Sequence, residues 1–499
     1  MRRLAALACL CLAPICAQQG KPPDTDELER ELKRFLDVFL ITNEQAADAV
    51  NPDAAYYGGA IPGMLRRLDP HSVFFDKDQF QQLEEMERSV SKGFGSIVSV
   101  LPGRVIVLQT MPSSPSQKAG LSPGDEIVGI NNIPLARLDL DQLVQVLGMT
   151  RQKEAQLLVR RQGTAKLMQF TMTPEELQSP SVDRSFLLEP GIGYVRATSF
   201  DPNTATLVQE AIEGLGGAKL KGLVVDLRDN PGGVLQAGLA TAALFLKPGT
   251  RILSARGRSA ATEDVDVPKD ARPYEFPLAV LVNGKTASAA EIVAGAMQDH
   301  DRGVILGETT FGKGLVQRVF PLSDKTGLAL TTAFYYTPSG RSIQKPLKDY
   351  ELAAATQVTE RPKFQTEHGR SVLGGGGIEP DETVLPPAPT RLRAVMETSG
   401  SYSAFATNWL VLHRADVKRE MEISAAMLDD FQLYLSRRNI RPGLSEWSNE
   451  REYTRRRLKQ EILNQGIGVA AGDEIEMRSD PAVRRALALF AAQAEQEKR

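Results

Sequence analysis

The chain has 499 residues, a length that suits about three domains of ordinary size. Hydrophobic residues make up 42% of it and charged residues 24%, which excludes wholesale disorder and fibrous repeats. The 59 basic and 62 acidic side chains leave a net charge of −3, so we expect no nucleic-acid partner, because nucleic-acid-binding domains usually present a basic face.

The first 17 residues have the pattern of a secretory signal peptide. Arg2 and Arg3 precede the apolar stretch Leu4–Ile15, which is too short to span a membrane. All three cysteines lie in this segment, so cleavage near Ala17 would leave a mature chain without thiols, suited to an oxidising periplasm or cell envelope. Lipidation of Cys16 and retention of the segment as an apolar anchor are the alternatives.

The segment from residue 18 to 84 is predicted to be mostly helical. Apolar residues recur at helical spacing in its first half, whereas Tyr56 to Gly59 is typical of a loop. The pattern breaks at Pro70, and we expect the following His71 to be a turn residue. The helical spacing is carried by Leu28, Leu32, Phe35, Val38 and Phe39.

Residues 85–175 have the pattern of a compact β-rich module. Short strands alternate with turns, and one amphipathic helix is predicted over Leu140 to Leu147. The turn cluster Gly120 to Asp125 lies between two of the strands. The expected strands cover residues 97–100, 105–109, 126–130, 155–161 and 167–172.

Residues 176–388 alternate strands with helices, which indicates a partly parallel α/β sheet. Glycines 374–377 and the prolines after them mark a boundary, and residues 389–499 are helical and charged. The whole chain is therefore predicted to be a multidomain α/β protein with helical segments at both ends. The expected core strands cover 193–196, 222–227, 278–282, 304–306, 315–320 and 328–336, and the expected helices cover 203–214, 234–245 and 288–300.

Several known catalytic sequence motifs occur in the chain, but the predicted structure around them does not fit the motif. Ser122 lies in a GxSxG pattern, yet Pro123 begins a turn where a nucleophile elbow needs a helix. The stretch 307–313 is nearly a phosphate-binding loop, but Gly314 stands where Ser or Thr must hold magnesium. The SxxK and KTG patterns of penicillin-binding enzymes occur at 89–92 and 325–327 without their middle motif.

We expect no metal and no cofactor. The histidines do not pair at metal-ligand spacing, and the sequence has no HExxH pattern. We interpret them as surface or capping residues. They are His71, His300, His368 and His413.

A serine at a strand-to-helix junction is the first candidate catalytic residue. Ser288 follows the predicted strand 278–282 and opens a helix, and a helix N-cap is its alternative role. Lys313 has glycine on both sides, which lets other groups approach it closely. Because no histidine is well placed, a desolvated lysine is the base that fits such a serine. Gln317, four residues further along a predicted strand, would orient the amine without adding charge. A surface lysine in a turn and an exposed strand residue are the alternative roles of Lys313 and Gln317.

The turn over residues 226–233 is the other half of the candidate site. It joins a strand end to a helix and contains two glycines, Gly232 and Gly233. Glycines there expose backbone N–H groups, which an oxyanion hole needs. An ordinary strand-to-helix turn is the alternative.

These segments resemble the carboxyl-terminal processing peptidases, the tail-specific serine proteases, in the family's order over residues 63 to 381. The resemblance implies that Ser288 is the nucleophile, Lys313 the general base and Gln317 its orienting partner. It also implies that the backbone amides of Gly232 and Ala289 form the oxyanion hole. The matching stretches are GMLRRLDPHS at 63–72, DLRDNPGG at 226–233, TASAAEI at 286–292, GETTFGKGLVQ at 307–317, TPSGRSIQ at 337–344 and GGGGIEPD at 374–381.

The β-rich module resembles a PDZ domain, which an α/β serine-protease core would carry as an insertion. PDZ domains bind an extended chain end by strand addition and hold its carboxylate with backbone N–H groups. Residues 116–117 and 150–154 depart from the family pattern and leave the specificity of the PDZ domain open. Its carboxylate-binding loop would consist of Gly93, Phe94, Gly95 and Ser96.

The resemblance implies an ATP-independent serine endopeptidase of the cell envelope that binds protein C-terminal tails through its PDZ domain and cleaves upstream of them. A catalytically inactive PDZ scaffold is the alternative. Proteins or peptides with exposed tails are the expected partners. Residues 389–499 match no motif, and a cap on the core, a homo-oligomer interface and an adaptor-docking surface are the roles considered for them.

Overall fold

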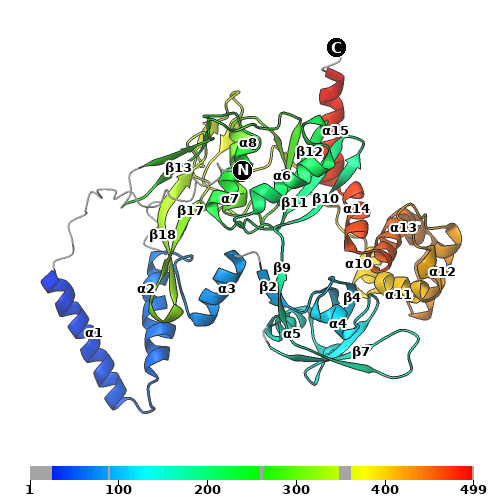
Figure 1. The fold of residues 1–499 in the computed structure, drawn as a ribbon, viewed down its shortest axis with the longest axis horizontal. Helices are drawn as coiled ribbons and strands as arrows, with labels where there is room; N and C mark the ends of the chain where they lie inside the picture. Colours follow the sequence, from blue (N-terminus) through cyan, green and yellow to red (C-terminus); the bar gives the residue numbers. More distant parts are fainter. Residues whose placement is uncertain (1–24, 88–89, 152, 259–261, 348–360, 497–499) are drawn as a thin grey trace, which may run out of the picture.

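The computed structural model describes residues 25–87, 90–151, 153–258, 262–347 and 361–496 (Figure 1). The predicted signal peptide and Ser89 of the SxxK pattern lie outside these residues. The described chain has helices at both ends, a small β-rich unit and a larger α/β core, as the sequence predicts.

The α/β core is built on a sheet whose central strands are parallel. Strands β12 and β15 are buried at every position, as expected where helices cover both faces of a parallel sheet. Strand β10 pairs antiparallel with β11 at one edge, and the other neighbours are parallel. In spatial order the strands are β10 (Val182–Glu189), β11 (Ile192–Ala197), β12 (Gly222–Asp226), β15 (Leu278–Val282), β16 (Val304–Gly307) and β21 (Glu382–Thr383).

Alternate residues of the central strands face helices from different parts of the chain. Val225 belongs to the hydrophobic cluster formed with the helices that follow the strands. Its neighbour Val224 belongs to the opposite cluster, with Phe490 of the last helix. The chain's final helix therefore completes the core. The helices are α6 (Thr204–Leu215), α7 (Leu235–Ala243) and α8 (Ala289–Asp299) on one face and α15 (Pro481–Gln496) on the other.

A second sheet brings the N-terminal segment against the core. Strand β17 pairs antiparallel with β18, with a bulge between Val316 and Gln317. On its other side β18 pairs with the short strand β1, which the sequence does not predict. The strands are β1 (Val73–Phe75), β13 (Arg251–Arg256), β14 (Glu263–Asp266), β17 (Leu315–Pro321) and β18 (Gly327–Tyr336), and β19 (Lys363–Gln365) pairs separately with β20 (Ser371–Leu373).

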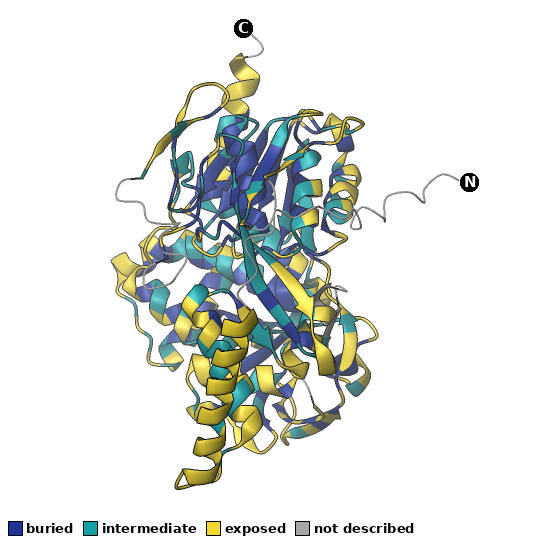
Figure 2. Cartoon of the chain, turned by 90° about the vertical axis from the view of Figure 1, so that its left-hand side faces the viewer, coloured by how far each residue is buried: buried dark blue, intermediate teal, exposed yellow. Residues whose placement is uncertain are grey.

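The N-terminal segment is helical, and the helix α2 (Ile61–Leu68) ends just before Pro70, as predicted. The other helices are α1 (Thr25–Gln45) and α3 (Lys77–Glu87). Along α1, which is described over its full length, no residue is buried, and Figure 2 shows this helix exposed over most of its length.

The expectation of a loop at Tyr56 to Gly59 is wrong. Residues Ala54–Ala60 form a π-helical turn that runs directly into α2. The ring centroids of Tyr56 and Phe39 are 4.7 Å apart, and Tyr57 stacks on Phe74 at 5.3 Å. These aromatic contacts are long-range packing, which overrides the local preference of a glycine pair for a loop.

The β-rich unit enters and leaves through one strand pair, β2 (Val90–Gly93) with β9 (Glu175–Gln178). Strand β3 lies at the edge of its sheet and pairs with β4 alone among the described strands. The other elements are β3 (Ser96–Leu101), β4 (Arg104–Thr110), α4 (Pro115–Ala119), β5 (Glu126–Ile130), β6 (Ile133–Pro134), α5 (Leu140–Thr150), β7 (Ala155–Arg160) and β8 (Met168–Met172).

The C-terminal helices contact both the β-rich unit and the core. Val469 N donates to Gln109 Oε1 of β4 at 2.9 Å. Arg228 of the core donates to Asp480 Oδ2 at 2.7 Å. These helices therefore bridge the two units (Figure 1). They are α10 (Arg391–Thr398), α11 (Ser401–His413), α12 (Ala425–Arg437), α13 (Leu444–Gly466) and α14 (Val469–Ser479).

Candidate active site

Ser288 lies where the sequence places it, between the buried strand β15 and helix α8. Its backbone has φ 55° and ψ −119°, a conformation that side-chain-bearing residues rarely adopt. Such a conformation costs on the order of 1–3 kcal/mol and persists only where the surroundings enforce it. Strain of this kind at a strand-to-helix turn is typical of nucleophile sites.

The loop before Ser288 is bonded to the glycine turn at the end of β12. Thr286 Oγ1 donates to Leu227 O at 2.8 Å, and Ala287 N donates to Asn230 O at 2.9 Å. Asn230 is fully buried, and its Nδ2 donates to Ala197 O at 2.8 Å. The two loops therefore form one hydrogen-bonded unit.

Gly232 and Ala289, the predicted oxyanion-hole residues, lie side by side. A Cβ added to Gly232, which has φ +93°, would lie 2.8 Å from Ser288 Cβ and 2.9 Å from Ala289 N. Only glycine fits such a close approach. The Gly232 N–H donates to Asn230 Oδ1 at 2.8 Å, so it must exchange this partner before it can bind a substrate oxyanion.

Lys313, which lies just before β17, is hydrogen-bonded to Gln317, which lies within this strand. Lys313 Nζ donates to Gln317 Oε1, and Gln317 Nε2 donates to His71 O at 2.6 Å. Burial lowers the pKa of Lys313 below its ordinary value, whereas the negative charges of Asp69 and Glu291 act in the opposite direction. A lysine whose pKa is lowered has more of its neutral amine near neutral pH, and the neutral amine is the form that can accept a proton.

Glu291 joins the serine loop to the lysine loop. Its Oε2 accepts from Ser288 N and from Lys313 N, both at 2.9 Å. Its Oε1 accepts from Thr310 Oγ1 at 2.5 Å and from Gly312 N at 2.7 Å. Burial raises the pKa of this carboxyl to about 7, although the hydrogen bonds to its oxygens favour the charged form.

Tyr335 of β18 adds a second link between the same two residues. Its hydroxyl lies 2.6 Å from Lys313 O and 3.3 Å from Ser288 O, and its ring is buried. The backbones of Ser288 and Lys313 are thus held together from two sides. Within the described ranges no hydrogen bond joins Ser288 Oγ to Lys313 Nζ, whose proton is directed at Gln317 instead.

Several residues that build this site are not predicted from the sequence. Glu291, Tyr335 and Asn230 were not singled out, and His71 was interpreted only as a turn residue. Glu291 and Asn230 lie inside the matching motifs, and a carboxylate among apolar helix residues is the signal that could have identified Glu291. The part played by the His71 carbonyl has no signal in the side-chain pattern.

The predicted carboxylate-binding loop lies at the start of the edge strand β3. Gly95 has φ +73°, and a Cβ there would lie 2.3 Å from Ser114 Cβ. Ser96 Oγ lies 2.5 Å from Ser116 Oγ, which ties the loop to α4. Phe94 packs against the core of the β-rich unit, and Gly93 ends β2. An open strand edge beside a glycine turn is the geometry that strand addition requires.

The other catalytic patterns have the contexts that the sequence predicts. Ser122 N donates to Asp125 Oδ2 at 2.9 Å within a turn. After the phosphate-loop-like stretch the chain continues as strand β17 and not as a helix.

Over the described ranges, no three His, Cys, Asp or Glu side chains gather as a metal site needs. None of the helices in the described part is long and apolar enough to cross a membrane.

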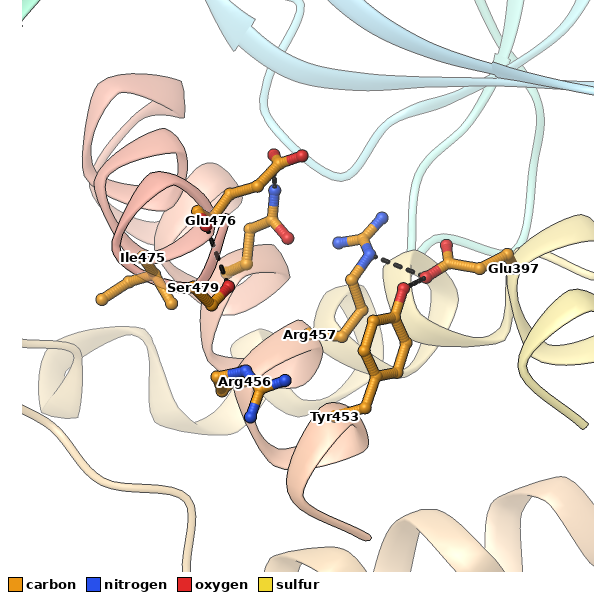
Figure 3. A pocket seen from close by; sticks show the side chains of 8 residues that line it. Glu397, Tyr453, Arg456, Arg457, Ile475, Glu476 and Ser479 are labelled. Carbon is orange, nitrogen blue, oxygen red and sulfur yellow. Dashed lines mark hydrogen bonds and ion pairs between the residues drawn. The ribbon is translucent and has the colours of Figure 1, made fainter. Parts of the chain in front are cut away.

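A polar pocket of about 340 Å³ lies among the C-terminal helices, between α10, α13 and α14 (Figure 3). Its polar groups bond mainly to one another. Tyr453 and Arg457 both donate to Glu397 Oε1, and Gln460 donates to Glu476 Oε2. The pocket is lined by Glu397, Tyr453, Arg456, Arg457, Gln460, Ile475, Glu476 and Ser479.

Two stretches of the chain match known families. Residues 191–352 match the sequence profile described as peptidase family S41, and residues 85–160 match that of the PDZ domain. Both matches fall on the units described above, the α/β core and the β-rich unit. Fold and site together define a serine-type peptidase with a PDZ domain.

Curated relatives narrow this class. The chain is 35% identical over 369 residues to a carboxy-terminal-processing protease of Bartonella bacilliformis, covering 72% of this chain and 84% of the relative. It is 30% identical to a carboxyl-terminal-processing protease of a Synechocystis species, covering 75% and 94%. It is 31% identical to the carboxy-terminal processing protease CtpB of Bacillus subtilis, covering 73% and 80%. The chain belongs to the carboxy-terminal processing proteases, and proteins are its substrates.

Proposed function

We propose that the protein is a serine endopeptidase in which Ser288 is the nucleophile and Lys313 the general base. The observation that carries the proposal is the strained Ser288, held beside a half-buried lysine by the shared contacts of Glu291. Gln317 orients the lysine amine, and the backbone N–H groups of Gly232 and Ala289 stabilise the oxyanion.

The reaction proceeds through an acyl-enzyme. Neutral Lys313 accepts the proton of Ser288 while Oγ attacks the carbonyl carbon of the scissile bond. The carbonyl π electrons move to the oxygen, which the oxyanion donors stabilise. The C–N bond then breaks, and Lys313 gives its proton to the leaving amine. A water molecule hydrolyses the ester, with Lys313 accepting and returning a proton again.

This reaction requires Lys313 Nζ to come within hydrogen-bonding reach of Ser288 Oγ while Gln317 Oε1 still accepts one of its protons. It also requires the Gly232 N–H to exchange Asn230 Oδ1 for the substrate oxyanion. We propose that a tail bound to the PDZ domain favours this aligned arrangement, because a ligand shifts an equilibrium toward the state it binds more tightly. The bound tail would extend the sheet at β3, next to the Gly93–Ser96 loop.

Export and assembly complete the proposal. A cysteine-free mature chain behind a signal peptide suits the periplasm or cell envelope. The C-terminal helices contact the PDZ domain and the core, which supports a structural role for them. Docking of an adaptor and homo-oligomer formation through this region are further proposals.

The test is cleavage of a protein with an unfolded C-terminal tail by the mature chain, over about pH 6 to 10. Ser288→Ala and Lys313→Ala should both be inactive. Ser122→Ala and Lys325→Ala are matched controls, because they change the same residue types in the rejected motifs, and they should keep wild-type activity. Activity that survives Ser288→Ala would show that the nucleophile is another residue.

The PDZ role needs a separate readout. Gly95→Trp should lower cleavage of long tails more than cleavage of short peptides, since only long tails reach the PDZ loop and the active site together. Equal loss on both would contradict gating by the tail. A wild-type chain that binds tails but cleaves none of several sequences, and that does not react with a serine-directed covalent probe, would favour the inactive scaffold.

A further inference from the structure

The turn from Asp69 to Ser72, between α2 and β1, is buried and closed by its own side chains. Asp69 is 1% exposed and Ser72 4% exposed. Asp69 Oδ1 accepts from His71 N at 2.7 Å and from Ser72 N at 2.8 Å. Asp69 Oδ2 accepts from Ser72 Oγ at 2.6 Å. A carboxylate with these partners fixes the direction of the backbone carbonyls in the turn.

The turn is bonded to the sheet that carries Gln317. Ser72 Oγ accepts from Thr331 N at 3.1 Å, and Thr331 lies opposite Gln317 in the β17–β18 register. A bulge falls at this point, so the pairing of the two strands is irregular where the turn binds. The chain then continues as β1, whose Val73 pairs with Ala329. The turn is therefore fixed to β18 at Thr331 and at Ala329, directly beside the bulge.

The carbonyl at the centre of this turn determines which end of the Gln317 amide faces Lys313. Gln317 Nε2 donates to His71 O at 2.6 Å, and Gln317 Oε1 accepts from Lys313 Nζ. An amide has one donor end and one acceptor end. With a carbonyl on one side, the amide nitrogen must point there, and the oxygen must point to the lysine. Without that carbonyl, the amide can rotate and present its NH₂ group to the amine.

We propose that Asp69 and Ser72 are positioning residues of the peptidase reaction, acting through the His71 carbonyl and the Gln317 amide to aim Lys313. This inference rests on the proposed serine–lysine function. It gives the N-terminal segment a role in catalysis, because the residues that direct the lysine lie well outside the region matched to the peptidase family.

Charge provides a second readout of the same contact. The ionisable groups that act on Lys313 are Asp69 from the turn and Glu291 from α8, and burial together with the charge of Lys313 lowers the pKa of His71. The Asp69 carboxylate raises the pKa of Lys313 against the effect of burial. Asp69→Asn removes the charge while keeping an acceptor oxygen for the turn. The pKa of Lys313 then falls, and activity should set in at lower pH.

The experiment compares Asp69→Ala, Asp69→Asn and Ser72→Ala with Asp76→Asn. Asp76 is an exposed aspartate a few residues further on that accepts from Gln79 N, so it is a matched control of the same residue type. Asp69→Ala should lower kcat by roughly 10-fold or more with little change in KM, because misplacing a reacting group affects kcat. Asp69→Asn should retain more activity and shift the rising limb of the pH profile to lower pH.

A double-mutant cycle separates positioning from a loss of fold. If Asp69 acts through Gln317, Asp69→Ala should have no further effect on kcat in a Gln317→Ala background. Unchanged kcat and pH profile in Asp69→Asn and Asp69→Ala, or full additivity with Gln317→Ala, would overturn the inference. An Asp69→Ala chain that fails to fold leaves Asp69→Asn and Ser72→Ala to decide. Failure of the proposed function is a different outcome, since Ser288→Ala would then remain active.

Discussion

Replacing Glu291 with Gln tests the central link of the site with almost no change of shape. The carboxylate accepts from Ser288 N and Lys313 N on one oxygen and from Thr310 Oγ1 and Gly312 N on the other. A glutamine keeps one acceptor oxygen but places an NH₂ group on the other side. At least one backbone N–H then faces the NH₂ group whichever way the amide turns, because only the Thr310 hydroxyl among the four partners can also accept.

Two effects of opposite sign determine how much Glu291→Gln changes the free energy of unfolding. Each buried donor left without its acceptor costs about 1–3 kcal/mol, so one or two lost bonds destabilise the fold by roughly 1–6 kcal/mol. Against this, Glu291 has a folded pKa raised from 4.5 to about 7, so the native state binds a proton more tightly than the unfolded state. Stability from this group is therefore lost as pH rises through about 7, by roughly 2–3 kcal/mol between pH 5 and pH 8. The Glu291→Gln variant does not lose this stability, because glutamine does not titrate.

Urea unfolding followed by circular dichroism at pH 5 and pH 8, with kcat/KM at pH 8, measures both effects. The destabilisation by Glu291→Gln should be larger at pH 5 than at pH 8 by roughly 2–3 kcal/mol. We expect kcat to fall about 10- to 100-fold, since Ser288 and Lys313 lose their common acceptor. Glu308→Gln, an exposed change nearby, should alter neither quantity. Wild-type kcat in the Glu291→Gln variant, together with a pH-independent difference in stability, would refute the reasoning.

Three further outcomes are expected. Gln317→Glu places a negative charge next to Lys313, which should raise the pKa of the lysine and move the rising limb of the pH–rate profile to higher pH. An unchanged limb would argue against contact between residues 313 and 317 in the active state. Gly232→Ala should abolish cleavage, because its Cβ meets the serine loop, whereas Gly249→Ala, also at positive φ but with nothing within 4 Å, should cost only about 1–2 kcal/mol of stability and no activity. Phe490→Ala should lower the unfolding free energy by about 3–5 kcal/mol, since the ring is 5% exposed in the core; a change below about 1 kcal/mol, measured by urea unfolding, would mean that α15 does not complete the sheet.

Much of the fold follows from local pattern. The strands at 222–227 and 278–282 and the helices that follow them are where alternation and helical spacing predict them. Such periodicity is visible in sequence because burial on one face repeats every two or 3.6 residues. The glycine pair at Gly58 and Gly59 misled this logic, since ring contacts of Tyr56 and Tyr57 hold the segment helical. The packing of α15 on the central sheet likewise depends on contacts between distant parts of the chain.

The candidate site also has a part that the sequence predicts and a part that only the tertiary structure shows. The sequence alone singles out Ser288, Lys313 and Gln317, because their chemistry requires those residue types next to glycines, strand ends and a helix start. Only the tertiary structure shows that Glu291 joins the serine and lysine loops, that Asn230 holds the Gly232 N–H, and that a carbonyl from residue 71 directs the amide of residue 317. These contacts are made by backbone atoms, which every residue carries, between segments as much as 246 positions apart. No spacing rule records them, so the residue types of the site were predictable and their alignment was not.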